Sequence, residues 1–166
     1  IVLNLLPFLF TTIVFSQFNQ NQWDSYTSYL TPTGIVLGAD GLIYASTKGG
    51  LLSFNPQTES FLFTKIEDGL DYLDLSTITK DSSGRLYLGG AYPEGYLQVF
   101  DPQLGVVRKI THLDIAKIHQ IVIGKESAFV SYSGFTIGDM GILEFNLDAD
   151  GLPVFKDYHI KFKDGE

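Results

Sequence analysis

The sequence contains three histidines, the residue type most often used in catalysis and metal binding. They are His112, His119 and His159. No two of them have the HxH or HExxH spacing that brings two imidazole nitrogens to one zinc ion. The chain also has no cysteine, so it offers no thiolate ligand and no cysteine nucleophile. Nor does it contain a GxSxG nucleophile elbow. The sequence therefore predicts no catalytic residue, no cofactor-binding residue and no metal ligand.

The segment Asn146–Asp157, "NLDADGLPVFKD", imitates a calcium-binding loop. Its first, third and fifth positions carry oxygen ligands and its sixth is glycine, which is the order of an EF-hand loop. Pro153, however, stands where an aliphatic residue is usual, and Asp157 replaces the bidentate glutamate that ends such loops. A polar turn between two strands explains the same residues. We adopt the turn interpretation, and calcium binding stays open.

Two further groups of residues have a possible chemistry and a simpler alternative. Four acids lie within "EDGLDYLDL", namely Glu67, Asp68, Asp71 and Asp74. Paired carboxylates can cleave glycosidic bonds when they are suitably spaced, but a solvated acidic connection between strands is the simpler interpretation. The insertion "AYPEGY" carries Tyr92 and Tyr96. Exposed tyrosines there could anchor a protein or stack on a sugar, whereas the simpler interpretation is packing within a long hairpin.

Composition narrows the class of protein. Phe (13), Tyr (9) and Gly (17) are abundant, which favours an all-β fold. The formal net charge is −8 and the basic residues are scattered. A nucleic-acid-binding protein needs a clustered basic face, so we expect no nucleic-acid partner.

The beginning of the sequence predicts export. Residues 1–16 are almost wholly apolar up to Phe15 and end in a small residue, which is typical of a secretory signal peptide cleaved between Ser16 and Gln17. The apolar run is too short for a stable membrane span. A buried first strand or helix is the alternative. Residues 17–33 form a lead-in segment in which Trp23–Tyr29 has the pattern of a closing strand. We expect a periplasmic, cell-surface or secreted location.

A repeat of about 42–46 residues organises the rest of the chain. The stretch that begins at Ala39 aligns with the stretch that begins at Ser83. The matched pairs are Gly41 with Gly84, Ile43 with Leu86, Tyr44 with Tyr87 and Phe54 with Phe100. A weaker third copy places Phe129 after Tyr87 and Phe145 after Phe100 at the same period. The units span about 34–70, 71–114 and 115–162.

Each unit is expected to contain four short strands separated by turn residues such as Asp40-Gly41 and Asp101-Pro102. The first unit has strands at Ile35–Leu37, Ile43–Ser46, Leu51–Phe54 and Phe61–Lys65. The second has them at Leu75–Thr79, Leu86–Gly89, Tyr96–Phe100 and Val106–Ile110. The third has them at His119–Ile123, Ala128–Ser131, Ile142–Phe145 and Val154–Ile160. Four strands per period are typical of β-propeller blades. We therefore predict an all-β partial β-propeller of about three antiparallel blades, with a β-sandwich as the alternative.

The repeat resembles that of the two-component-regulator propellers. The second unit matches the family pattern at Asp81, Gly84, Leu86 and Gly89, and the first matches it at Gly41, Ile43, Thr47, Gly50, Leu51, Phe54 and Asn55. Tyr44 and Tyr87 stand where the family usually has tryptophan. "QNQWDSYTSY" and "GILEFNLDADGLPVFKDYHI" look closer to the PorZ-like group, which the resemblance links to type IX secretion.

The repeat residues are clear and catalytic residues are absent, so we expect a non-catalytic, exported module whose loops bind a protein or a glycan. It would serve as a scaffold, a sensor or a secretion accessory. One alternative is the periplasmic sensing region of a hybrid two-component regulator that recognises polysaccharide. The other is part of a propeller hydrolase or lyase whose active-site blades lie elsewhere. We also expect the sequence to be clipped at both ends. Three unclosed blades would then be marginally stable and prone to aggregate.

Overall fold

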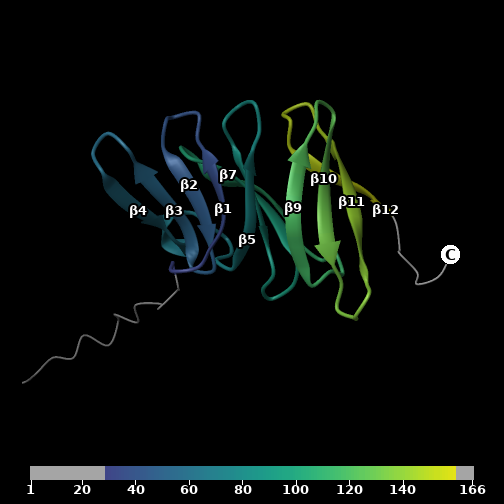
Figure 1. The fold of residues 1–166 in the computed structure, drawn as a ribbon. Coiled ribbons are helices and arrows are strands. Elements are labelled where there is room, and N and C mark those ends of the chain that lie inside the picture. Colours follow the sequence, from purple (N-terminus) through teal and green to yellow (C-terminus); the bar gives the residue numbers. More distant parts are fainter. Residues whose placement is uncertain (1–28, 160–166) are drawn as a thin grey trace, which may run out of the picture.

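The computed structural model describes residues 29–159 (Figure 1). Within these residues, twelve strands form three four-stranded antiparallel sheets. Each sheet is a simple meander whose strands follow chain order, and we call the sheets blades 1, 2 and 3. The predicted signal peptide, nearly all of the predicted strand Trp23–Tyr29 and the end of the third unit lie outside the described residues.

The strands lie where the sequence predicts them, with ends that differ by one to three residues. Blade 1 contains β1 (Pro32–Leu37), β2 (Ile43–Thr47), β3 (Gly50–Asn55) and β4 (Ser60–Thr64). Blade 2 contains β5 (Leu75–Lys80), β6 (Leu86–Gly90), β7 (Tyr96–Asp101) and β8 (Gly105–Ile110). Blade 3 contains β9 (Lys117–Ile123), β10 (Ser127–Ser133), β11 (Met140–Leu147) and β12 (Pro153–His159). A 3-10 helix, η1 (Ile66–Asp68), lies between blades 1 and 2. The all-β prediction is confirmed.

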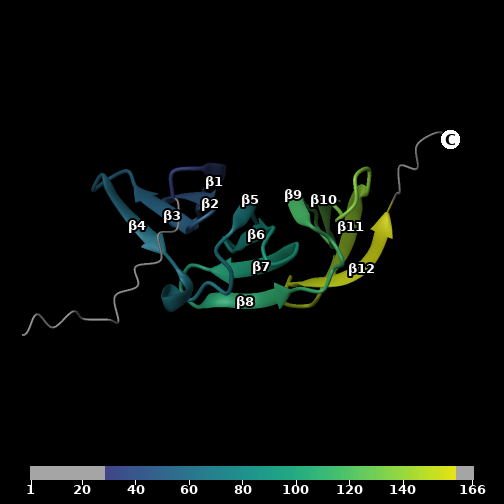
Figure 2. The same cartoon turned by 90° about the horizontal axis from the view of Figure 1, so that it is seen from below.

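The three blades fan out from the side on which β1, β5 and β9 lie (Figure 2). The first strand of each blade contacts the first strand of the next: β1 contacts β5, and β5 contacts β9. The fourth strands lie towards the outside of the fan (Figure 2). This is the arrangement of neighbouring propeller blades, and it brings the turns of one blade beside those of the next.

Blade 2 is the centre of the molecule because its two faces enter two different hydrophobic clusters. Side chains alternate between the faces of a strand. Leu86 and Leu88 therefore join Tyr44 of blade 1 in one cluster. Tyr87 joins Val130 of blade 3 in the other. All five residues of β6 are buried, so the central blade has no solvent-covered face at this strand.

Three turns that contain glycine share one backbone geometry. The turns span residues 38–42, 81–85 and 148–152, and the N–H of the first residue donates to the carbonyl of the fifth over 2.7, 3.0 and 2.9 Å. The fourth residue is Gly41, Gly84 or Gly151, with φ of 82°, 94° and 73°. Glycine adopts this left-handed region at little steric cost. The shared geometry makes the turns directly comparable.

No helix in the range 29–159 is long and apolar enough to cross a membrane.

Candidate functional site between blades 1 and 2

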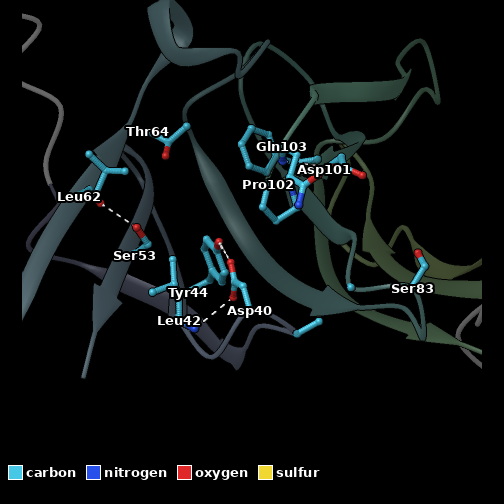
Figure 3. A pocket seen from close by; sticks show the side chains of 13 residues that line it. Asp40, Leu42, Tyr44, Ser53, Leu62, Thr64, Ser83, Asp101, Pro102 and Gln103 are labelled. Atoms are coloured by element: carbon cyan, nitrogen blue, oxygen red, sulfur yellow. Dashed lines mark hydrogen bonds between the residues drawn. The ribbon is translucent and has the colours of Figure 1, made fainter. Parts of the chain in front are cut away.

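An open cavity of about 550 Å³ lies between blades 1 and 2, and we call it the inter-blade groove (Figure 3). Blade 1 contributes the 38–42 turn and side chains of β2, β3 and β4. Blade 2 contributes the Ser83–Gly84 turn and the turn that follows β7. The groove therefore lies where turns of adjacent blades meet.

Asp40 and Tyr44 form the polar centre of the blade 1 wall. The Tyr44 hydroxyl donates to Oδ2 of Asp40 over 2.6 Å, and the N–H of Leu42 donates to Oδ1 over 3.0 Å (Figure 3). Tyr44 is 4% exposed. Its burial, with a further contribution from Asp40, raises the phenol pKa far above its ordinary value of 10.0. Tyr44 is therefore a neutral hydrogen-bond donor at physiological pH.

Gly38 makes room for this arrangement. A Cβ atom at residue 38 would lie 2.4 Å from Oδ1 of Asp40 and 2.6 Å from the Tyr44 ring. Both distances are shorter than real Cβ contacts allow. The missing side chain of Gly38 therefore lets the Asp40 carboxylate lie beside the phenol.

The blade 2 wall is a turn ordered by its own aspartate. Oδ1 of Asp101 accepts the N–H of Gln103 over 2.8 Å. Among the described residues, Asp101 and Asp40 are the charged side chains that line the groove, and the lining contains no lysine, arginine or histidine. The groove therefore carries a negative charge that its own lining does not balance.

The matching space between blades 2 and 3 is bridged by Arg85. Its Nε donates to Oδ2 of Asp81 over 2.8 Å, and its Nη1 donates to the carbonyl of Asp150 over 2.8 Å. The Tyr87 hydroxyl donates to the carbonyl of Gly151 over 2.7 Å. These bonds join blade 2 to the 148–152 turn of blade 3. A cavity of about 270 Å³ lies beside them.

A second arginine strengthens the same bridge. Nη2 of Arg108 donates to Oδ2 of Asp148 over 2.8 Å. Between blades 1 and 2, by contrast, no hydrogen bond among the described residues joins the 101–104 turn to blade 1. One inter-blade space is closed by charged side chains and the other is open.

The repeat explains the difference. Leu42 occupies the position of Arg85, since each is the fifth residue of its turn. Leu62 occupies the position of Arg108, because Ser53 pairs with Leu62 as Val99 pairs with Arg108. Two leucines thus replace two arginines. The aligned repeat contains this signal, but reading it requires the strand register, and sequence reasoning missed the groove.

The calcium-like segment forms the hairpin between β11 and β12, as the turn interpretation predicted. Oδ1 of Asp148 accepts the N–H groups of Asp150 (3.0 Å) and Leu152 (2.8 Å), while Oδ2 binds Arg108. Asn146 lies in β11 and Asp157 in β12. Among the described residues no group of three acidic or histidine side chains is placed to hold a metal ion.

The acids of the 67–74 connection have separate contacts. Oδ2 of Asp68 accepts the N–H of Lys65 over 3.0 Å at the start of η1. Asp71 pairs with Lys109 over 3.0 Å. The carbonyl of Asp74 accepts the hydroxyl of Tyr96 over 3.0 Å. The acids lie on a connection between strands, as predicted. The contacts of Asp68, Asp71 and Asp74 are made to different partners.

The two tyrosines of the insertion differ in exposure. Tyr92 is 72% exposed, whereas Tyr96 is fully buried in β7 and belongs to the core between blades 1 and 2. For Tyr96 the packing interpretation is confirmed and the exposed-anchor interpretation is wrong, because β7 is buried on both faces from Tyr96 to Phe100.

The three histidines have different surroundings. His112 lies beside Glu94, with Nδ1 3.3 Å from Oε1, and His119 is an exposed residue of β9. Nε2 of His159 lies 2.5 Å from Oε2 of Glu144, whose Oε1 accepts Nζ of Lys156 over 2.7 Å. Hydrogen bonds from Lys156 and His159 lower the pKa of Glu144. Sequence reasoning missed this pairing between β11 and β12.

No protein-family model and no curated protein sequence matches this chain. The fold and the groove define its class, which is an all-β protein built from β-propeller-type blades. The resemblance to the two-component-regulator propellers and their PorZ-like group stays a prediction.

Proposed function

We propose that this chain is a non-catalytic binding module of an exported β-propeller. It holds a protein or glycan partner in the inter-blade groove and serves as a scaffold, a sensor or a secretion accessory. The location outside the cytoplasm rests on the apolar character of residues 1–16. The link to two-component-regulator propellers rests on the repeat residues.

The observation that carries this proposal is the open groove of about 550 Å³ between blades 1 and 2. Its size falls within the range of small-molecule and peptide-side-chain sites. Its lining combines apolar surface from Leu42 and Pro102 with hydrogen-bonding groups from Ser53 and Gln103. Convergent polar groups on an apolar wall are the usual composition of a binding site.

The chemistry of the lining favours binding over catalysis. The Tyr44 phenol is held neutral and already donates to Asp40, so it is a poor general base. The Asp101 carboxylate is engaged with the backbone of its own turn. In the part of the chain that the structure describes, no histidine lines the groove to activate a nucleophile.

The test uses two matched tryptophan variants of the full chain. Gln103 and Gln57 occupy the same position in two like turns, and the N–H of each donates to the side chain two residues earlier. Gln103 lines the groove, whereas Gln57 does not. Gln103→Trp is expected to weaken ligand binding at least tenfold, and Gln57→Trp is expected to leave it unchanged.

Binding would be measured by isothermal titration calorimetry with neutral oligosaccharides and short peptides of each charge. Equal affinities for the two variants would place binding outside the groove and overturn the proposal. Circular dichroism of both variants provides the folding control.

A further inference from the structure

We propose that the inter-blade groove binds the guanidinium group of an arginine side chain supplied by a partner protein. This inference rests on the proposed function and names the chemistry of the partner. It comes from comparing the groove with the space between blades 2 and 3, where the protein's own Arg85 lies between an aspartate and a turn.

The carboxylate that would receive the guanidinium is present in both spaces. Oδ1 of Asp40 accepts the N–H of Leu42, just as Oδ1 of Asp81 accepts the N–H of Arg85 over 2.9 Å. The two aspartates occupy different positions in their turns. Because Gly38 has no side chain at the position of Asp81, the Asp40 carboxylate takes that place.

The cation is present in one space and absent from the other. Oδ2 of Asp81 accepts Nε of Arg85, whereas Oδ2 of Asp40 accepts the hydroxyl of Tyr44. Leu42 and Leu62 stand where arginines bridge the neighbouring blades. The groove keeps two carboxylates, and no basic side chain from residues 29–159 lines it. A cation from outside restores the charge balance that Arg85 and Arg108 provide between blades 2 and 3.

The lining favours arginine over a sugar. Saccharides bind to proteins largely by stacking on exposed aromatic rings. The aromatic residues of the groove are Tyr44 and Phe100, and they are only 4% and 5% exposed. The lining therefore offers no open ring as a platform. The net charge of −8 also attracts a cationic partner and disfavours an anionic one.

Arginine fits better than lysine for a geometric reason. Its planar guanidinium presents five N–H donors in a fixed fork that matches a carboxylate, whereas lysine presents a compact ammonium. Asp40 and Asp101 line opposite walls of the groove, one from each blade. A guanidinium can donate to acceptors on both sides, as Arg85 does between Asp81 and Asp150.

The experiment is an NMR titration of the ¹⁵N-labelled full chain with the tripeptide acetyl-Gly-Arg-Gly-amide. The control peptide contains citrulline, which has the shape of arginine without its charge. The expected result is saturable shifts of the backbone amides of Leu42, Ser83 and Gln103, with a dissociation constant on the order of millimolar for so small a probe. The citrulline peptide is expected to bind at least tenfold more weakly.

Three variants test the assignment. Asp40→Asn keeps an oxygen acceptor for the Leu42 N–H and removes the charge, so we expect at least a tenfold loss of affinity. Asp150→Asn removes one charge from the 148–152 turn of blade 3, which has the same backbone geometry but lies outside the groove, and is expected to change nothing. Leu42→Arg places a guanidinium in the groove from within the chain and is expected to abolish binding. The dispersion of the amide spectrum verifies the fold of each variant.

The outcomes separate this inference from the proposed function. Equal binding of the citrulline peptide, or unchanged binding by Asp40→Asn, would overturn the guanidinium assignment. Groove shifts with a neutral oligosaccharide such as cellotetraose, but not with the arginine peptide, would also overturn it while supporting the proposed function. If no probe shifts the groove amides, both proposals fail.

Discussion

The two inter-blade spaces of this protein are built from the same repeat, but one is bridged by arginines and the other is open. Between blades 2 and 3, Arg85 and Arg108 reach the 148–152 turn. Between blades 1 and 2, leucines occupy both arginine positions and a cavity of about 550 Å³ remains. Beneath the turns, each pair of neighbouring blades shares a buried hydrophobic cluster. Both pairs of blades therefore keep apolar packing, together with one hydrogen bond between their first strands, while the contacts between their turns differ.

The largest expected effect tests whether the two apolar layers are equivalent. Leu88 and Leu143 are both fully buried, one in each cluster. Leu88→Ala and Leu143→Ala should each lower the free energy of unfolding by about 2–5 kcal/mol, because each leaves a cavity in a packed core. Urea denaturation measures both. A cost below about 1 kcal/mol for one of them would mean that its interface is not held by apolar packing.

The next effect concerns the bridge between blades 2 and 3. Arg85→Leu copies the residue of the open space and removes the only cationic partner of the Asp81 carboxylate among the described residues, while its hydrogen bonds from Ser83 remain; this carboxylate is 7% exposed. We expect a loss of about 2–3 kcal/mol in the free energy of unfolding.

The control for Arg85→Leu is Lys109→Ala, which breaks the more exposed ion pair with Asp71. This variant should cost at most about 1 kcal/mol, because exposed pairs contribute little. Equal costs for the two variants would show that the Arg85 bridge behaves as an ordinary surface contact.

The pH dependence of the free energy of unfolding should reflect the carboxyls between blades 2 and 3. Burial alone would raise the pKa of Asp81, but hydrogen bonds from Ser83 and Arg85 outweigh it and hold the pKa below 3.8. The backbone N–H of Leu152 is the main cause that lowers the pKa of Asp148. A carboxyl with a lower pKa in the folded state stabilises the fold when it is ionised. This contribution is present above pH 3.8 and is lost as the pH falls through the folded-state values.

The double variant Arg85→Leu, Arg108→Leu sharpens that comparison. It removes the arginine partners of both carboxylates and keeps the hydrogen bonds from Ser83 and Leu152, so its stability should fall somewhat less between pH 5 and pH 2 than that of the unmodified chain. Thermal unfolding over this range measures the difference. Identical slopes would assign the acid sensitivity to other carboxyls.

The smallest effect on stability concerns the two faces that no described blade covers. Ile35 and Phe61 of blade 1 are 72% and 60% exposed, and Phe61 packs on Phe54 with ring centroids 4.7 Å apart. The corresponding surface of blade 3 is mixed, because Glu144 pairs with Lys156 while Phe129, its partner in register, is 42% exposed. Phe61→Ser should change the free energy of unfolding by about 1 kcal/mol or less and should lower self-association. Unchanged light scattering for this variant would mean that self-association does not occur through the exposed face of blade 1.

Much of the fold was predictable because it depends on local rules. Alternation of side chains along short segments and glycine at turn positions predicted the strands, and the period predicted the three blades. The turn interpretation of Asn146–Asp157 is confirmed for the same reason. Packing of Tyr96 was likewise the simpler interpretation of the sequence, whereas its complete burial depends on the hydrophobic cluster between blades 1 and 2.

What the sequence by itself determined is the set of strands, their grouping into blades and the positions of their turns. These follow from interactions between residues that lie close together in the chain. Only the tertiary structure decided where the site lies. Arg85 meets Asp150 across 65 residues, and Leu42 faces the 101–104 turn from another blade. Whether two such distant positions close a space or leave it open depends on how the blades stack, because the contact exists only after both hydrophobic clusters have formed.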